Sequence, residues 1–215
     1  MIPVVSHPAK YNDAFMPTFA KLAKGSKRIL DPFAGTGKIF ALQEMLPDAE
    51  IRAIEIEPEW AALDPRIEIG DALELPFPDN FFDAIITSPC YGNRMADTLL
   101  DGYKRITYTS CIGRKLHPHN AGSLQWGKKY RDFHWRAWEE AKRVLQNGGI
   151  FILNIKDHIR AGEQQMVTDW HIDALQALGF AVNNMLKIDT PSMGFGENRE
   201  KRVPYEEIIK FTLHK

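Results

Sequence analysis

The stretch from Arg28 to Phe40, which reads RILDPFAGTGKIF, decides the expected fold. Arg28–Phe33 is a short apolar run typical of a buried strand, and Lys38–Leu46 has the pattern of a helix. Between them, Gly35 and Gly37 allow the backbone to approach a ligand closely, beside the free N–H groups at the start of the helix. The stretch therefore predicts a ligand-binding loop between a strand and a helix.

Two common phosphate-binding loops do not fit this turn. A P-loop needs glycine at position 32 and serine or threonine at position 39, where the chain has Pro32 and Ile39. A dinucleotide fingerprint needs glycine at position 40, which is Phe40. What remains is a short glycine turn with an acidic residue, Asp31, in front of it.

The rest of the chain alternates apolar runs with helical patterns, which indicates βα units. We expect an α/β fold with a seven-stranded, mostly parallel sheet and helices on both faces. The further expected strands are Ile51–Ile56, Arg66–Ile69, Phe82–Thr87, Ile150–Ile155, Phe180–Ile188 and Glu206–Leu213, and the further helices are Ala9–Lys24, Pro58–Leu63, Phe133–Leu145 and Gln164–Leu178.

Length and composition indicate one soluble, globular domain. The chain has 215 residues, of which 44% are hydrophobic and 26% are charged. No apolar run reaches the ~18 residues of a membrane span, so we expect no membrane association. The N-terminus lacks the pattern of a secretory signal, and the only cysteines are Cys90 and Cys111. We therefore expect a cytoplasmic protein in a reducing compartment.

Positive charge is concentrated in one segment, although the formal net charge is −1. Residues 92–130 form a stretch without clear periodicity, and such long loops are often functional. The segment carries an excess of five positive charges, which suits either a solvated loop or contact with an anionic partner. Its seven basic residues are Arg94, Lys104, Arg105, Arg114, Lys115, Lys128 and Lys129.

Acidic residues follow the second and third expected strands. A carboxylate about twenty residues after a glycine turn can accept both hydroxyls of a ribose, and Glu55 and Glu57 compete for that role. Asp71, after the third strand, can accept from an exocyclic amine such as that of adenine. Because ligands of open α/β sheets bind beyond the carboxyl ends of the strands, these acids and the glycine turn predict one site.

The fourth strand ends in Ser88-Pro89-Cys90-Tyr91. Together with DPFAGTG at residues 31–37, this tetrapeptide resembles the S-adenosylmethionine-dependent amino methyltransferases, which modify the exocyclic nitrogen of cytosine or adenine in DNA. The resemblance implies a single domain over residues 1–215 with the Rossmann-like methyltransferase fold, and a target-recognition insertion at residues 92–130. It also implies S-adenosylmethionine as cofactor, no metal ion, DNA as partner with RNA possible, and restriction-modification as the setting.

The resemblance assigns roles to individual residues. Those that match the catalytic tetrapeptide are Ser88, Pro89 and Tyr91. Those that match the cofactor site are Lys10, Tyr11, Asp31, Phe33, Gly35, Gly37, Glu55 and Asp71. The seven basic residues of the insertion are the expected nucleic-acid contacts.

The chemistry of the tetrapeptide is coherent. The lone pair of an aromatic amine is delocalised into the ring, so acceptors aimed at its N–H groups are needed to localise it. Ser88 Oγ and the carbonyl of Pro89 are the expected acceptors, and positioning then allows in-line methyl transfer. Tyr91 is expected to stack on a base that has left the duplex.

The chain departs from the family pattern in two ways. Cys90 replaces the second proline, which puts the rigidity of the loop in question and raises the weaker alternative of a cysteine nucleophile. We also expect no separate recognition domain, so the insertion, with the loop from Gly194 to Arg202 as a second edge, is the expected target contact.

Several alternatives remain open at this stage. RNA guanine-N2 and protein glutamine methyltransferases have similar tetrapeptides, and an inactive nucleic-acid-binding module is a further reading. His117 and His119 match no zinc spacing with Cys111 and are expected to be solvated or to face nucleic acid. Lys156 follows the fifth strand and either lines the site or lies in a plain loop.

Overall fold

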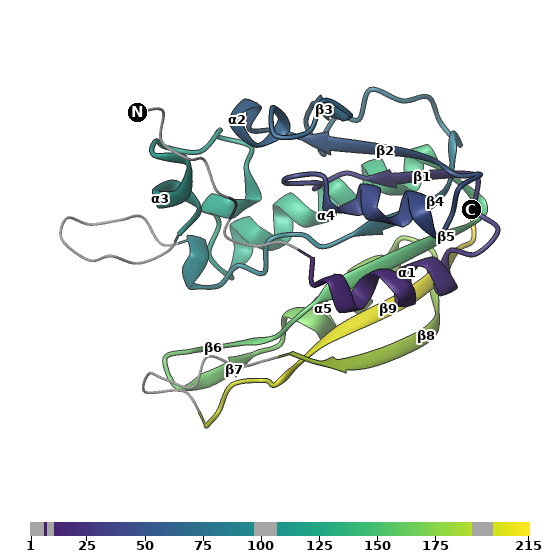
Figure 1. Cartoon of the computed structure of the whole chain (residues 1–215). Helices are drawn as coiled ribbons and strands as arrows, with labels where there is room; N and C mark the ends of the chain where they lie inside the picture. The colour runs from purple at the N-terminus through teal and green to yellow at the C-terminus, as the bar shows by residue number, and fades with distance from the viewer. Residues whose placement is uncertain (1–6, 8–10, 97–106, 191–199) are drawn as a thin grey trace.

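The computed structural model describes residues 7, 11–96, 107–190 and 200–215 (Figure 1). Lys10, Lys104 and Arg105, and most of the loop from Gly194 to Arg202, lie outside the described residues. The strands are β1 (Arg28–Asp31), β2 (Glu50–Glu55), β3 (Ile67–Ile69), β4 (Phe82–Thr87), β5 (Leu145–Ile155), β6 (His158–Arg160), β7 (Glu163–Gln165), β8 (Phe180–Asp189) and β9 (Tyr205–Leu213). The helices are α1 (Met16–Leu22), α2 (Pro58–Ala61), α3 (Tyr108–Ile112), α4 (Lys128–Val144) and α5 (Val167–Ala177), with short 3₁₀ helices η1 (Asp13–Phe15), η2 (Lys38–Glu44), η3 (Arg94–Ala96) and η4 (Ala121–Ser123).

The central sheet has seven strands in the order β3-β2-β1-β4-β5-β9-β8. Strand β9 is antiparallel to both neighbours, and the pairs among β1 to β5 are all parallel. The carboxyl ends of β1 to β5 therefore share one edge of the sheet. The strand order reverses between β1 and β4, and ligands of open α/β sheets bind at such a point.

Helices cover both faces of the sheet, as expected from the sequence. Successive residues of a strand point to opposite faces. Accordingly, Leu30 packs in a cluster with α4 and α5, while Ile29 packs in a second cluster with α1, η2 and α2. The two clusters form a core on each side of the sheet, and Figure 1 shows α1 and α4 on opposite sides of the strands. The predicted fold class is confirmed.

Several predicted boundaries were inexact. The first helix was predicted from Ala9, but α1 begins at Met16, with Pro17 in its first turn, where the missing N–H costs nothing. The helix predicted over Lys38–Leu46 is the 3₁₀ helix η2. Helix α4 begins five residues before the predicted Phe133, because Tyr130 continues the buried face that His134 and Trp138 occupy.

The β6–β7 hairpin was not predicted. Its pairing runs from His158↔Gln165 to Arg160↔Glu163, with Ala161 and Gly162 at the turn. Both turn residues have positive φ, 52° and 80°, as a tight two-residue hairpin requires. Its strands are mostly polar, so they lack the apolar alternation that marks a strand in sequence.

The segment 92–130 contains η3, α3, η4 and the start of α4 among its described residues. Thr107 caps α3, because its hydroxyl accepts from the Ser110 amide while the Ser110 side chain accepts from the Thr107 amide. Over the part of the chain that the structure describes, no helix is long and apolar enough to cross a membrane.

Candidate active site

A cavity of about 410 Å³ opens at the carboxyl edge of the sheet. The loop after β1, the end of β2 and the loop after β4 contribute to its walls, and the segment around Asn120 adds a further wall. The predicted site residues that it brings together are Tyr11, Phe33, Gly35, Glu55, Ser88, Pro89 and Tyr91. Asp31, Gly37 and Asp71 do not line it, although all three were predicted to bind the cofactor.

Asp31 holds the loop together from inside the protein. Its buried carboxylate accepts hydrogen bonds from the Tyr11 hydroxyl at 2.8 Å, the Thr87 hydroxyl at 3.0 Å and the Phe33 amide at 3.1 Å. Burial raises the pKa of Asp31 to about 6, although the three donors pull the pKa down. Asp31 therefore orients Tyr11 and the turn, which is a correction to its predicted direct contact.

The two glycines of the turn have different tasks. Gly35 has φ +57° and lies in the cavity wall, where an added Cβ would come within 3.3 Å of the His7 ring. Gly37 has φ +76°, and an added Cβ would come within 3.0 Å of Ile67, a core residue. Gly37 is therefore required for the turn and the packing beneath it, and not for contact with the cavity.

Glu55 lies at the inner end of the cavity and is only 7% exposed. One of its oxygens accepts from the Gly35 amide and the other from the Glu57 amide, both at 2.9 Å. Burial raises the pKa of Glu55 to about 7. Because each carboxylate oxygen has two lone pairs, Glu55 retains capacity for two further donors.

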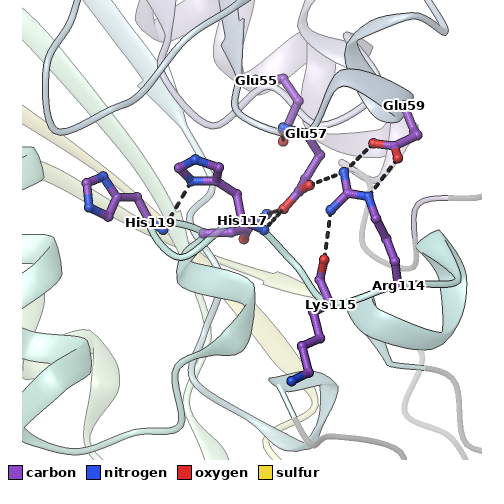
Figure 2. A network of polar contacts seen from close by, with 8 residues as sticks. Glu55, Glu57, Glu59, Arg114, Lys115, His117 and His119 are labelled. Atoms are coloured by element: carbon purple, nitrogen blue, oxygen red, sulfur yellow. Dashed lines mark hydrogen bonds and ion pairs between the residues drawn. The ribbon is translucent and has the colours of Figure 1, made fainter.

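Glu57, the competitor of Glu55, does not line the cavity and takes part in a network with Arg114 and His117 (Figure 2). Its fully buried carboxylate accepts from Arg114 Nη2 at 2.7 Å, the His117 amide at 2.6 Å and Asn120 Nδ2 at 2.8 Å. The structure thus separates the two acids: Glu55 faces the cavity, and Glu57 anchors the segment from Arg114 to Asn120.

Asp71 is also engaged within the protein. Its carboxylate contacts His119 Nδ1 at 2.6 Å and accepts from the Leu73 amide at 2.8 Å. Its neighbours Gly70 and Ala72 line the cavity, as does His119. The predicted direct role of Asp71 is therefore replaced in this structure by a contact that fixes His119 at the rim.

The tetrapeptide after β4 is part of a polar network that the sequence analysis missed. Ser88 Oγ lies 2.9 Å from Tyr91 Oη, and the Tyr91 hydroxyl donates to Glu206 Oε2 at 3.0 Å. Asn154 Nδ2 also donates to Glu206, at 2.9 Å. Glu206 and Lys156 line the cavity. An asparagine inside the apolar run FILNIK was the available signal for Asn154, whereas nothing local marks Glu206.

The tetrapeptide loop is supported at Cys90 by a hydrogen bond to its backbone. The Tyr130 hydroxyl donates to the Cys90 carbonyl at 2.6 Å and also lies 2.9 Å from His171 Nε2. Burial raises the pKa of the Cys90 thiol to about 12, so the thiol is protonated at neutral pH. These contacts argue against a cysteine nucleophile and identify Tyr130 as the residue that holds the loop.

The basic residues of the insertion differ in their engagement. Arg114 pairs with Glu57 and Glu59 within the protein, and its contact with nucleic acid stays a prediction. Lys128 pairs with Asp132 on the surface of α4, and Lys115 and Lys129 are exposed. Arg94 lies in η3. Within the described residues, no three His, Cys, Asp or Glu side chains gather as metal ligands would.

Residues 82–215 match a family model described as DNA methylase. The chain belongs to this family. The match spans β4 to β9 and so includes the tetrapeptide, Asn154 and Glu206.

Other known proteins resemble this DNA methylase family member over shorter or more distant matches. A demethylmenaquinone methyltransferase from Thermus thermophilus is 40% identical over 75 residues, which are 30% of this chain and 34% of the relative. The chain spans between about a third and less than half of the length of the curated relatives it matches.

Solved structures share the fold at low sequence identity. TrmN from Thermus thermophilus aligns with a TM-score of 0.61 and 16% identity, covering 96% of this chain and 50% of that one. A SAM-dependent methyltransferase from Aquifex aeolicus aligns with a TM-score of 0.52 and 13% identity, covering 95% of this chain and all of that one. The predicted Rossmann-like methyltransferase fold is confirmed.

S-adenosylmethionine is the cofactor of this family member, and the cavity fits it. Gly35 lets the backbone approach a ligand, and Glu55 retains free acceptor positions beside it. The indole N–H of Trp60, in the cavity wall, is buried without a hydrogen-bond partner among the described residues. The cavity has both polar and apolar walls and lies where the strand order reverses between β1 and β4. A cavity of this size and position suits a nucleoside with a charged tail.

Proposed function

We propose that the protein transfers a methyl group from S-adenosylmethionine to an exocyclic amino nitrogen of a DNA base, cytosine N4 or adenine N6. The observation that carries this proposal is that Ser88 and Pro89 line the same cavity as Gly35 and Glu55. An acceptor for amine N–H groups therefore lies beside the expected cofactor site. When bound, the cofactor supplies a methyl group on a positively charged sulfur.

The residues of the cavity divide into two groups. Glu55 is proposed to accept from the ribose hydroxyls, with Gly35, Phe33 and Tyr11 lining the rest of the cofactor site. Ser88 Oγ and the Pro89 carbonyl are proposed to accept from the target amine and so localise its lone pair. Holding the amine and the methyl donor in line is proposed to supply much of the rate enhancement. No covalent enzyme intermediate is needed.

Tyr91 is held by hydrogen bonds in addition to its proposed stacking role. Its hydroxyl bonds Ser88 and Glu206, so the ring is fixed at the cavity wall. A base that enters the cavity from an unstacked position would meet this ring. We therefore retain Tyr91 as the proposed stacking residue and add that it orients Ser88.

DNA is proposed to approach over residues 92–130, the target-recognition insertion. Among the described residues of this segment, Lys115, Lys128 and Lys129 are exposed, and each can contact a phosphate. His119 and Asn120, in the same segment, line the cavity. This arrangement supports a surface that positions a target strand above the tetrapeptide.

A carbon acceptor of a quinol type is the second candidate. The observation in its favour is the 40% identity to a demethylmenaquinone methyltransferase over 75 residues. Such a substrate is methylated on carbon and carries no amine. The two acceptors of the protein, the Ser88 hydroxyl and the Pro89 carbonyl, would then have no N–H group to bind. The pairing of Ser88 with Pro89 therefore favours an amine.

The test is transfer of a tritiated methyl group to unmethylated DNA, RNA, protein and a demethylated quinol in parallel. We expect label in DNA, as N4-methylcytosine or N6-methyladenine after digestion to nucleosides. Ser88→Ala should reduce turnover by about 10²-fold while calorimetry shows nearly unchanged cofactor affinity. Label confined to protein or quinol would end the DNA proposal, and loss of cofactor binding in Ser88→Ala would end the role of Ser88.

A further inference from the structure

A continuous chain of hydrogen bonds leads from Ser88 to a carboxylate. Ser88 Oγ lies 2.9 Å from Tyr91 Oη, and the Tyr91 hydroxyl donates to Glu206 Oε2 at 3.0 Å. A tyrosine hydroxyl has one hydrogen. Because that hydrogen goes to Glu206, Ser88 is the donor in its bond with Tyr91. Ser88 Oγ also accepts from Asn154 Nδ2 at 3.3 Å, so one of its two lone pairs remains for an N–H group in the cavity.

Glu206 is held in place from β5. Asn154 Nδ2 donates to Glu206 Oε2 at 2.9 Å and lies 3.1 Å from Tyr91 Oη. Asn154 is fully buried, which fixes its amide in this position. The positive charge of Lys156 acts on Glu206 from the end of the same strand, and Lys156 Nζ donates to Thr190 Oγ1 at 2.7 Å.

We propose that Glu206 accepts the proton that the target amine loses on methylation, passed on through Ser88 and Tyr91. This inference rests on the proposed amino methyltransferase function and adds a residue to it. A neutral serine hydroxyl is a far weaker base than a carboxylate, so it can pass a proton on but cannot hold it. A site built on serine therefore needs a terminal base, and the hydrogen bonds lead to one.

The step balances as follows. The lone pair of the amine nitrogen forms the N–C bond to the methyl group, and the C–S bond breaks with its electron pair going to sulfur. The methylated nitrogen then releases one N–H proton to Ser88 Oγ. The Ser88 hydroxyl proton moves to Tyr91 Oη, and the Tyr91 proton moves to Glu206. The products are a neutral methylated amine, a neutral thioether and a protonated carboxyl group.

Groups from three parts of the fold face Glu206. From the loop after β4 it faces Tyr91, and from β5 it faces Asn154 and the cation Lys156. On β8 its register partner is the apolar Ile188. Lys156 supplies a positive charge near the carboxylate, and Tyr91 donates a hydrogen bond to it.

The test compares Glu206→Gln, Glu206→Asp and Tyr91→Phe with the wild type. Single-turnover methyl transfer to DNA is followed from pH 5.5 to 9 at saturating cofactor. We expect Glu206→Gln and Tyr91→Phe to be slowed by about 10²-fold, with cofactor affinity unchanged by calorimetry. Glu206→Asp should recover much of the rate. The matched control is Glu207→Gln, whose partner is Lys187 and not the cavity, and which should behave as wild type.

A second readout needs no methyl acceptor. Infrared difference spectra of the cofactor-free, ¹³C-glutamate-labelled protein on acidification should contain a carboxyl band that Glu206→Gln removes and Tyr91→Phe shifts. The relay is overturned if Tyr91→Phe leaves that band unmoved, if Glu206→Gln keeps the wild-type rate within twofold, or if Glu206→Asp is as slow as Glu206→Gln. A wild type that does not methylate DNA would end the proposed function, and the infrared result would still decide the relay.

Discussion

At the scale of single residues, the site depends on buried carboxylates with different neighbours. Asp31, Glu55 and Glu57 are each less than a tenth exposed, yet only Glu55 lines the cavity. Asp31 is bonded by two hydroxyls and an amide, and Glu57 by a guanidinium, an amide N–H and a side-chain amide. The neighbours of each acid therefore decide its role: Asp31 holds the loop, Glu55 faces the cavity and Glu57 anchors a segment.

Cofactor affinity should depend on the protonation of Glu55. Burial raises its pKa to about 7 in the cofactor-free protein, and hydroxyl donors favour the charged form. Binding should therefore be tight at pH 8 and weaken as pH falls through 7, by roughly 10-fold at pH 6. Calorimetry over this range measures the effect, with Glu55→Gln as the control that should bind weakly and without this pH dependence. Tighter binding at pH 6 than at pH 8 would contradict the role of Glu55.

The sequence motifs identified seven of the residues that line the cavity but not their hydrogen-bond partners. Gly35, Glu55 and Ser88 were predicted correctly to share one site, because each follows a strand whose apolar run is visible locally. Glu206 is 115 positions after Tyr91, and Tyr130 is 40 positions after Cys90. Contacts at such separations depend on strand order and helix placement, which no local pattern specifies.

At the scale of elements, the segment from Thr107 to Ser123 is attached to the end of β2 through Glu57. Arg114, His117 and Asn120 all bond the same carboxylate. Glu57 is also bonded to Glu55 through its own amide, so the segment and the cavity meet at two neighbouring acids. The position of this wall of the cavity therefore depends on an ion pair in which the carboxylate is buried and the guanidinium is partly exposed.

Arg114→Gln should loosen the segment. It removes the charged partner of the fully buried Glu57, while Arg114 itself is 41% exposed, so we expect a loss of roughly 1–3 kcal/mol in the free energy of unfolding. Hydrogen exchange should increase over residues 107–123 before the rest of the chain.

Lys115→Gln, at the exposed neighbouring position, is the control and should leave both quantities unchanged. If Arg114→Gln kept full stability and instead weakened DNA binding, the arginine would serve the nucleic-acid role first predicted for it.

At the scale of the whole molecule, the order of helices and strands along the chain could be predicted well, whereas the residues at which they begin and end could not. Alternating apolar runs specify seven strands and their covering helices, and these are the strands of the central sheet. The β6–β7 hairpin escaped prediction because its strands are polar, and the 3₁₀ form of η2 because its residues suit either helix type. The strand order, with β9 between β5 and β8, brings Glu206 to the cavity and is a global property.

The charge distribution leads to a prediction for DNA binding. Lys128 and Lys129 lie at the start of α4, in the proposed target-recognition insertion, whereas Lys24 is an exposed lysine just before β1, at the opposite edge of the sheet. The double variant Lys128→Gln and Lys129→Gln should weaken DNA binding at low salt and reduce the slope of log affinity against log salt by about 1 to 2.

Fluorescence titrations at 50 to 200 mM salt measure that slope. Lys24→Gln should match the wild type in both affinity and slope. An unchanged slope in the double variant, together with unchanged affinity, would place the DNA surface elsewhere on the molecule.

The bond from Tyr130 to the Cys90 backbone also bears on how distant members of such a family are found in genomes. Stiffness that a second proline would supply locally comes here from an aromatic residue at the first turn of α4. Search patterns that insist on two consecutive prolines would pass over chains of this kind. A pattern that accepts a small residue at that point, provided a tyrosine opens the helix about forty positions later, would recover them.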